Sequence, residues 1–132
     1  MPKIDETREF IPVNIALLTV SDTRTLKDDR SGDILFQRAS DDGHIVLERA
    51  IVKDEINLIK EKLNLWINEP KIDVVISTGG TGFTGRDVTP EAFKATFEKE
   101  IEGFGELFRW ISFKKIGTST IQSRAVAGVA KG

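Results

Sequence analysis

Three short apolar runs alternate with segments of helical spacing, and this alternation constrains the fold more than any other feature of the chain. The runs are VNIALLTVS (13–21), HIVLERAIV (44–52) and IDVVIS (72–77). A near-continuous apolar run rich in β-branched residues is typical of a strand buried on both faces of a sheet. Because strands that alternate with helices form parallel sheets, we expect an α/β fold, a three-layer α/β/α sandwich with a mostly parallel sheet.

Helix signals lie between these strands. Ser31 is expected to cap a helix that runs to about Ser40 and that Gly43 closes. A second helix is predicted over 55–67, where apolar residues recur at helical spacing and Pro70 lies just beyond. Both helices connect one predicted strand to the next, as the crossovers of a parallel sheet require.

The last third of the chain is predicted to be mainly helical. Thr89 is expected to cap a helix that Pro90 starts, with Phe97 on its apolar stripe. Another helix is expected after Gly103, and the closing segment 120–132 also has a helical pattern.

Length and composition narrow the classes of function. The 132 residues suit one domain, preceded by a loose polar arm over residues 1–12. The net charge of −2 provides no basic surface, so we expect no nucleic-acid partner. The absence of cysteine excludes thiolate metal sites and cysteine nucleophiles. The apolar runs are too short to cross a bilayer and the N-terminus does not resemble a signal peptide, so we expect a cytoplasmic protein without a membrane partner.

The segment STGGTGFTGRDVTPEA (77–92) is the strongest functional signal. It holds four glycines within nine positions, directly after the third predicted strand. Three of these glycines can adopt positive φ and turn successive N–H groups toward one point, which makes a nest for an anion. Thr78 and Thr81 add hydroxyl donors. We predict that Gly79, Gly80 and Gly82 bind a phosphate group; the alternative is a glycine-rich turn that only leads into the next helix.

Other polar residues are expected beside this loop, because ligands of parallel sheets bind beyond the carboxyl ends of the strands. They follow the first and second strands or begin the first helix: Ser21, Asp22, Asp54, Ser31 and Gly32. Asp87 lies beside the predicted phosphate site but cannot bind phosphate directly. We therefore expect Asp87 to hold Mg²⁺ against phosphate oxygens.

Two nucleotide-binding patterns overlap the loop, and neither fits well. Gly80, Gly82 and Gly85 spell G-x-G-x-x-G, the pattern of a dinucleotide fold, but they follow the third strand and Pro90 starts the helix several residues later. The loop also begins like a P-loop, but Arg and Asp stand where Lys and Ser or Thr are required. An NAD-binding module remains a weak alternative.

Motifs along nearly the whole chain resemble a known family. They are TVSD, SGDIL, VVISTGGTGFTGRDVTPEA, EIEGFGELFRWISFKKIGTST and SRAVAGV, in that order. This series resembles the molybdenum-cofactor biosynthesis family that includes MoaB, MogA and the N-terminal domain of gephyrin, and it is most similar to the MoaB branch. The resemblance implies a single molybdopterin-binding domain over residues 1–132, in which the family's final strand and helix are missing.

The resemblance implies an enzyme, a molybdopterin adenylyltransferase. Such an enzyme transfers AMP from Mg-ATP to molybdopterin and releases pyrophosphate, so ATP and molybdopterin are the expected substrates and Mg²⁺ the expected cofactor. The family's pattern makes Asp87 and Asp54 candidates for Mg²⁺ binding and catalysis, although Asp54 could equally cap the helix over 55–67. A non-catalytic molybdopterin carrier is the alternative function.

The resemblance also assigns residues to the substrates. Gly79, Gly80, Thr81 and Gly82 would hold a phosphate of the pterin or of AMP, and Ser31 and Gly32 match the family's Ser-Gly at the site. Ser123, in SRAVAG, would be a further anion contact or only the cap of the last helix.

Four aromatic residues are too many for one helix of so small a chain to bury. They are Phe104, Phe108, Trp110 and Phe113. We expect some of them to form a subunit interface, and the resemblance implies a homo-trimer or homo-hexamer. Arg86 and Arg124 could neutralise phosphate, but exposed and solvated charge is their default interpretation. His44 is expected to be a strand residue and not a base.

Overall fold

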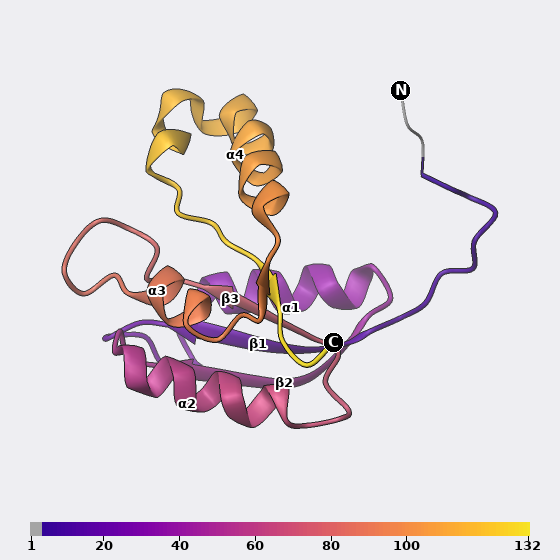
Figure 1. The fold of residues 1–132 in the computed structure, drawn as a ribbon, viewed down its shortest axis with the longest axis horizontal. Helices are drawn as coiled ribbons and strands as arrows, with labels where there is room; N and C mark the ends of the chain where they lie inside the picture. The colour runs from indigo at the N-terminus through magenta and orange to yellow at the C-terminus, as the bar shows by residue number, and fades with distance from the viewer. Residues whose placement is uncertain (1–3) are drawn as a thin grey trace.

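A three-stranded parallel sheet lies at the centre of the structure, a computed structural model that describes residues 4–132 (Figure 1). Its strands are β1 (Asn14–Val20), β2 (Ile45–Val52) and β3 (Val74–Thr78), and their order is β2-β1-β3. Both neighbours pair with β1 in parallel. The predicted strands and the parallel sheet are confirmed.

The middle strand is the most deeply buried element, as its apolar sequence predicts. Leu17 is 2% exposed and Leu18 is fully buried, although successive side chains of a strand point to opposite faces. Helices therefore cover both faces of β1. A strand that is covered on both faces can have apolar residues at successive positions and needs no alternation with polar residues.

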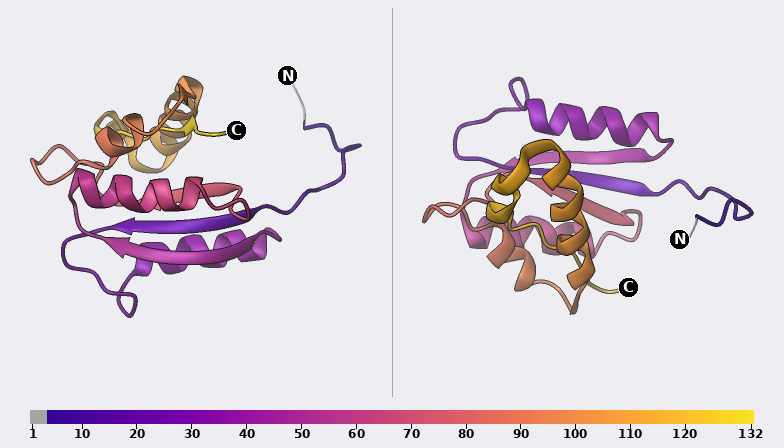
Figure 2. Two further views of the ribbon diagram at one scale, coloured as in Figure 1. Left: turned by 60° about the horizontal axis from the view of Figure 1, so that its bottom comes forward. Right: turned by 90° about the horizontal axis from the view of Figure 1, so that it is seen from above.

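Helices on opposite faces of the sheet complete the three layers (Figure 2). The helix α1 (Arg30–Asp41) covers one face, and α2 (Ile56–Ile67) covers the other beside the short helix α3 (Thr89–Lys94). Ile59, Leu63 and Trp66 of α2 form one core cluster with alternate residues of β1 and with Ala92 of α3. The α/β/α sandwich predicted from the sequence is confirmed.

The predicted cap of the first helix is wrong. The N-cap of α1 is Asp29, whose side chain accepts a hydrogen bond from the backbone N–H of Gly32 at 3.0 Å. Ser31 lies inside the first turn of α1. An aspartate two residues earlier thus makes the contact that was expected of the serine, because a capping oxygen must reach the N–H group two or three residues ahead. At the other end, Gly43 follows the helix with φ +90°, as expected of a closing glycine.

Asp54 does not cap α2 either. The N-cap is Glu55, and no side chain makes the capping hydrogen bond there. The capping interpretation of Asp54 is therefore wrong, and its carboxylate is available for another contact.

The helix after the glycine loop is shorter than predicted and begins differently. α3 has six residues, and Val88 is at its N-cap. Thr89 does not cap it, because its hydroxyl donates to the carbonyl of Gly79 at 2.8 Å. Phe97 lies beyond the end of α3. Its phenyl ring packs closely on Gly128, because a Cβ on Gly128 would lie 2.2 Å from the ring.

The end of the chain is not the helix predicted over 120–132. After α4 (Glu102–Ile116), which confirms the helix predicted beyond Gly103, a 3-10 helix spans Gly117–Gln122 and the chain then runs extended. The short strand β5 (Gly128–Val129) pairs antiparallel with β4 (Lys99–Glu100). Close packing of Gly128 on the Phe97 ring favours this extended path over the helical propensity of the segment.

The arm before the first strand has no helix or strand from residue 4 to residue 13, and it leads away from the sheet (Figure 1). Residues 1–3 of the predicted arm lie outside the described residues. The N–H of Val13 donates to Nδ1 of His44 at 3.1 Å. His44 immediately precedes β2, which begins at Ile45, so the prediction that His44 is a strand residue is wrong. Within residues 4–132, no helix is long and apolar enough to cross a membrane.

Candidate functional site

The carboxyl ends of the three strands meet at one edge of the sheet. The N–H of Ser21, after β1, donates to the carbonyl of Val52 in β2 at 2.8 Å. The N–H of Asp54 donates to the carboxylate of Asp22 at 3.1 Å. Thr78 at the end of β3 pairs in register with Thr19 of β1. The structure therefore brings together Ser21, Asp22, Asp54 and Thr78, four of the residues that sequence analysis expected at this edge.

A pocket of about 190 Å³ lies beside this edge, between the end of β1 and the start of α1. It is lined by Thr19, Val20, Ser21, Arg24, Asp29, Arg30, Ser31, Thr78 and Gly79. Four of these residues were predicted as site residues, whereas Arg24, Arg30 and Asp29 were missed. Two guanidinium groups beside two serine hydroxyls suit an anion, because they supply charge and hydrogen-bond donors together.

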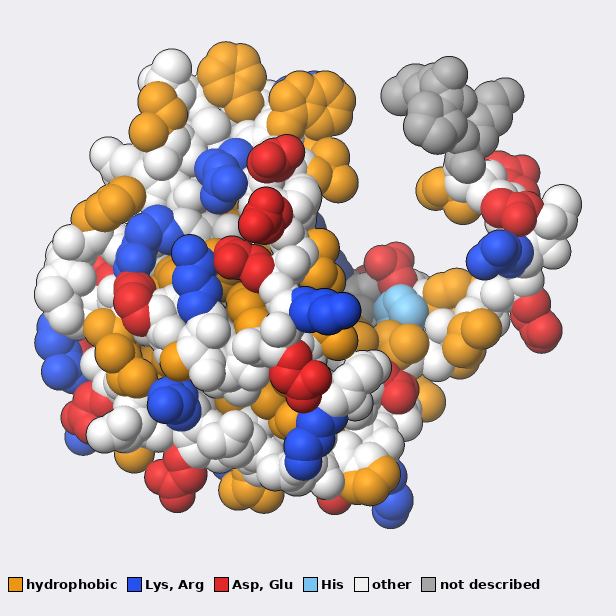
Figure 3. Space-filling view, viewed as in Figure 1, with side chains coloured by type: hydrophobic (Ala, Val, Ile, Leu, Met, Phe, Trp, Pro, Cys, Tyr) orange, Lys and Arg blue, Asp and Glu red, His pale blue; other side chains and the backbone are white. Residues whose placement is uncertain are grey.

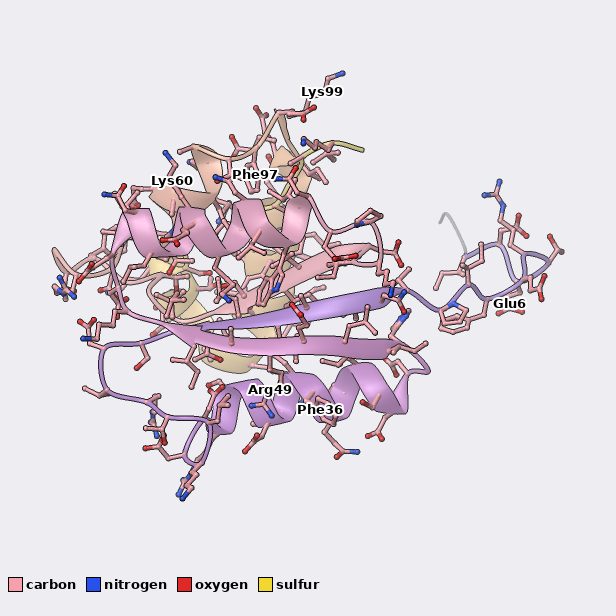
Figure 4. All side chains as sticks on the ribbon, turned by 90° about the horizontal axis from the view of Figure 1, so that it is seen from below. Glu6, Phe36, Arg49, Lys60, Phe97 and Lys99 are labelled. Atoms are coloured by element: carbon pink, nitrogen blue, oxygen red, sulfur yellow. The ribbon has the colours of Figure 1, made fainter. Side chains whose placement is uncertain are left out.

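Asp29 is the most deeply buried polar residue among those that line the pocket. Only 2% of its surface is exposed. The hydroxyl of Thr19 donates to its carboxylate at 2.7 Å, and Arg49 of β2 approaches the same oxygen at 3.3 Å. Arg49 reaches α1 from the sheet and lies over the ring of Phe36 (Figure 4). A buried carboxylate with these partners holds α1 against β1 and β2.

Gly32 packs against Asp29 and does not present its N–H group to the pocket, as a phosphate-binding residue would. Its N–H already donates to Asp29, and a Cβ at this position would lie 2.1 Å from an oxygen of that carboxylate. The glycine therefore permits the close approach of α1 to Asp29. The signal in the sequence was the pair Asp28-Asp29 before the helix, where acidic residues favour the N-cap.

The glycine loop leaves β3 through two left-handed residues. Gly79 has φ +93° and Gly80 has φ +68°. A Cβ on Gly79 would lie 2.2 Å from the carbonyl oxygen of Val20, so only glycine fits. The N–H of Thr89 donates to the carbonyl of Gly80 at 3.0 Å, which closes the loop onto α3.

Beyond this turn the loop exposes its backbone amides. Residues 81–86 are exposed. Within the described part of the chain, the backbone N–H groups of residues 80–83 donate to no protein acceptor. Gly82 also approaches Asp87 closely, because a Cβ there would lie 2.7 Å from a carboxylate oxygen. The loop thus combines packed glycines at its base with unpaired donors at its tip.

Two carboxylates flank this loop. Asp54 lies so close to Gly80 that a Cβ on the glycine would be 2.9 Å from Oδ1 of Asp54. Burial raises the pKa of Asp54, and the negative charges of Asp22 and Asp87 raise it further. Hydrogen bonds from the hydroxyl and the N–H of Thr84, at 2.7 and 3.0 Å, lower the pKa of Asp87. The negative charges of Asp22 and Asp87 beside Asp54 would favour a cation bound at this place.

Two arginines fasten the loop to its surroundings. Arg86 makes two hydrogen bonds to Asp22, at 2.8 and 3.0 Å, and these lower the pKa of that carboxyl. Arg124 contacts backbone carbonyls of the loop and the carboxylate of Glu91. Arg86 is exposed, as its default interpretation expects, although its guanidinium is bound to Asp22. The side chain of Arg124 is only 26% exposed and has defined partners, so the default interpretation is wrong for Arg124.

Ser123 lies apart from the other predicted residues. It lines a second hollow, of about 540 Å³, between α3 and α4. Its carbonyl accepts a hydrogen bond from Arg109 at 3.2 Å, and its N–H donates to Thr120 at the end of the 3-10 helix. Ser123 thus caps no helix N-terminus, and it does not line the pocket beside β1.

Asp54→Asn is expected to raise the melting temperature near neutral pH. The fold raises the pKa of Asp54, so its ionised form destabilises the protein above that pKa, and the penalty disappears as the pH falls through it. Thermal unfolding at a series of pH values should show a stabilised variant at pH 7 and no difference well below 3.8, the ordinary value.

Asp28→Asn provides a control of opposite sign. Hydrogen bonds from Thr25 lower the pKa of Asp28, so its ionised form stabilises the fold and that stability is lost on acidification. The control should therefore lower the melting temperature at pH 7. An unchanged or lowered melting temperature of Asp54→Asn at pH 7 would contradict the electrostatic description of this edge.

Comparison with known proteins agrees with this geometry. A family described as "probable molybdopterin binding domain" matches residues 16–131. The chain is 52% identical over 122 residues to molybdenum cofactor biosynthesis protein B of Escherichia coli K12, which covers 92% of this chain and 72% of that protein. It is 42% identical over 132 residues to the protein of the same name from Halalkalibacterium halodurans, covering 98% and 78% of the two chains.

Solved structures show the same fold. A crystal structure of molybdenum cofactor biosynthesis protein B superposes with a TM-score of 0.89 at 43% identity, covering 93% of this chain and 77% of that one. The tungsten cofactor synthesizing protein MoaB of Pyrococcus furiosus superposes with a TM-score of 0.80 at 35% identity, covering 92% and 75%.

The fold and the site define an α/β protein with an exposed glycine loop and paired carboxylates at the carboxyl edge of a parallel sheet. The chain belongs to the molybdenum-cofactor biosynthesis family, in its MoaB branch.

Proposed function

We propose that this chain adenylylates molybdopterin with Mg-ATP. The observation that supports this most is the loop of residues 80–83, whose N–H groups have no acceptor in the described part of the chain and which Asp54 and Asp87 flank. Unpaired amides attract phosphate oxygens and the carboxylates attract a divalent cation, so one edge of the sheet could hold both parts of a metal–nucleotide complex.

The proposed reaction joins two phosphates. A terminal phosphate oxygen of molybdopterin attacks the α-phosphorus of ATP, a new P–O bond forms, and the bond from that phosphorus to the oxygen bridging to the β-phosphate breaks. Pyrophosphate leaves with the electron pair. Such a transfer needs alignment and charge neutralisation more than a protein nucleophile, which suits a chain without cysteine.

The residues at the edge fit Mg²⁺. Magnesium in nucleotide sites is held by one or two carboxylates together with phosphate oxygens and water. Within residues 4–132, no group of three or more acidic or histidine side chains is placed to hold a metal ion, so Asp54 and Asp87 would be the protein's share. When bound, the ion would neutralise charge on the phosphates.

The chain's own residues would bind and orient the two substrates. The amides of residues 80–83 would hold one phosphate group, and the pocket lined by Arg24 and Arg30 would hold another. Ser21, Ser31 and Thr78 would add hydroxyl donors in that pocket. Asp22 would act indirectly, because Arg86 and the N–H of Asp54 occupy its carboxylate. We propose ATP and molybdopterin as the substrates and the cytoplasm as the location of this reaction.

A direct assay tests this proposal. The protein is incubated with molybdopterin and Mg-ATP, and adenylylated pterin is detected by mass spectrometry while pyrophosphate release is followed in parallel. Formation of both products in equal amounts supports the proposal, and omission of Mg²⁺ should abolish them. Binding of molybdopterin without either product would instead indicate the carrier function.

The NAD-binding alternative has little structural support. In a dinucleotide fold the third glycine of the pattern packs the helix on the strand, whereas a Cβ on Gly85 would meet nothing within 4 Å. Stabilisation by Mg-ATP but not by NAD in thermal unfolding would exclude it, since a ligand at 100 times its Kd stabilises by about 2.7 kcal/mol.

The exposed aromatic side chains of α4 support a homo-oligomer. Phe104, Phe108, Trp110 and Phe113 are between 43% and 61% exposed, and apolar side chains gather over this helix (Figure 3). A trimer or hexamer of the chain would bury such a surface.

Replacement of both Trp110 and Phe113 by Lys is expected to reduce the molar mass in solution to that of one chain. Light scattering coupled to size-exclusion chromatography measures the mass. Leu65→Lys is the matched control, because Leu65 is 62% exposed on α2, and it should leave the mass unchanged. An oligomer that persists in the double variant would contradict an interface on α4.

A further inference from the structure

We propose that Arg124 is a positioning residue that holds the glycine loop in its anion-binding shape. The nature of the anion rests on the proposed function, whereas the contacts between Arg124 and the loop do not. Arg124 lies 42 residues after Gly82 and outside every element of the sheet.

The guanidinium of Arg124 is surrounded by acceptors. Its Nε donates to the carbonyls of Thr81 and Gly82 at 3.1 and 2.9 Å, and its Nη2 donates to the carbonyl of Asp87 at 2.8 Å. Its Nη1 donates to both carboxylate oxygens of Glu91, at 2.6 and 2.9 Å. The side chain is 26% exposed, so these contacts are partly shielded from water.

The two successive carbonyls decide where the loop's amides point. In a trans peptide the C=O and the following N–H point in opposite directions, and the described chain contains no cis peptide. The carbonyl of Thr81 shares its peptide plane with the N–H of Gly82, and the carbonyl of Gly82 shares its plane with the N–H of Phe83. Because one nitrogen of Arg124 binds both carbonyls, both N–H groups are directed away from Arg124.

Arg124 supports residues 81–83, whose backbone makes no other hydrogen bond in the described part of the chain. The hydrogen bonds between Thr84 and Asp87 lie farther along the loop. Residues 81–86 are exposed, and nothing lies within 4 Å of a Cβ placed on Gly85. The centre of the Phe83 ring lies 5.5 Å from the guanidinium of Arg124. Phe83 is 70% exposed, so it makes little other contact with the protein. A planar fork of donors suits three carbonyls and a carboxylate, whereas the point charge of a lysine could not bind them together.

Arg124 is therefore not a phosphate ligand itself. All three of its nitrogens donate to protein acceptors, and the carboxylate of Glu91 neutralises its charge. Glu91 in turn belongs to α3, so the arginine ties the loop to the helix that follows it.

Tryptic cleavage after Arg86 tests the positioning role without any ligand. Arg86 lies in the exposed loop, but the protease must draw an extended stretch of chain into its active site, so it cleaves faster when the loop opens more readily. Arg124→Gln should increase the rate of this cleavage about 10-fold or more, because charge-assisted hydrogen bonds are lost. Arg124→Lys should also increase it. Cleavage after Lys60 and Lys62 in α2, followed by mass spectrometry, should stay as slow as in the parent protein.

Arg109→Gln is the matched control. Arg109 lines the same hollow between α3 and α4, but it donates to Ser123 and not to the loop. Its substitution should leave cleavage after Arg86 unchanged. An unchanged rate in Arg124→Gln, or an equal increase at Lys60 and Lys62, would overturn the proposal, because the second result would mean global unfolding.

Calorimetric binding of Mg-ATP tests the consequence for the anion. Arg124→Gln should weaken binding about 10-fold, and Arg109→Gln should not. A loop that opens in Arg124→Gln while Mg-ATP binds unchanged would overturn the link to anion binding. If the parent protein does not bind Mg-ATP at all, the proposed function fails, and the cleavage rates still decide whether Arg124 positions the loop.

Discussion

Asp87→Asn is expected to bind Mg-ATP while forming adenylylated pterin at least about 100-fold more slowly. The amide removes the negative charge that would hold Mg²⁺ but keeps an oxygen that can accept both hydrogen bonds from Thr84. The loop should therefore keep its shape. Initial rates of pyrophosphate release and the Kd of Mg-ATP by calorimetry, measured on the same preparation, separate catalysis from binding.

Asp28→Asn is the matched control for this experiment. Asp28 also accepts hydrogen bonds from the N–H and the hydroxyl of a threonine three residues earlier, but it lies in the loop before α1. Its substitution should leave the rate of adenylylation unchanged. Equal pyrophosphate release by Asp87→Asn and the parent protein would end the enzyme proposal.

Gly79→Ala is expected to cause the largest loss of stability among substitutions in the loop. The residue has φ +93°, and a Cβ would lie 2.2 Å from the backbone oxygen of Val20 in the central strand. Neither the strand nor the turn can move without breaking the sheet. We expect a decrease in the free energy of unfolding of about 3 kcal/mol or more, and a melting temperature lower by roughly 10 °C.

Gly85→Ala tests whether the position of the glycine matters. A Cβ on Gly85 would meet nothing within 4 Å, and its φ is not in the left-handed region. Its substitution should be neutral or stabilise by up to about 1 kcal/mol, because alanine has fewer unfolded conformations. Chemical denaturation of both variants measures the difference, and similar losses in the two would contradict the packing at Gly79.

The strands and the layers could be predicted because they depend on local pattern. The run over 13–21 has no polar alternation, and only a strand covered on both faces tolerates that. The helix over 55–67 also has a clear apolar period, and α2 begins and ends within one residue of its prediction.

The errors lie where another contact takes the place of the predicted one. Ser31 and Thr89 are both good capping residues, but a carboxylate from Asp29 makes the first cap and the carbonyl of Gly79 binds the hydroxyl of Thr89. The helical propensity of 120–132 likewise yields to the packing of Gly128 on Phe97. Asp29 was a competing local signal two residues from Ser31. The partners of Thr89 and Gly128 lie farther away in the sequence, so no local pattern could reveal them.

The sequence by itself determined the sheet, the glycine loop after its third strand and the acidic residues beside it, because each follows from residues that are neighbours in the chain. Only the tertiary structure decided what those residues contact. It placed the carboxylate of Asp54 against Gly80, buried Asp29 under Thr19 and brought Arg124 to the loop from the far end of the chain. The physical reason is that hydrogen bonds and burial depend on distances in space, which the folded chain sets only as a whole.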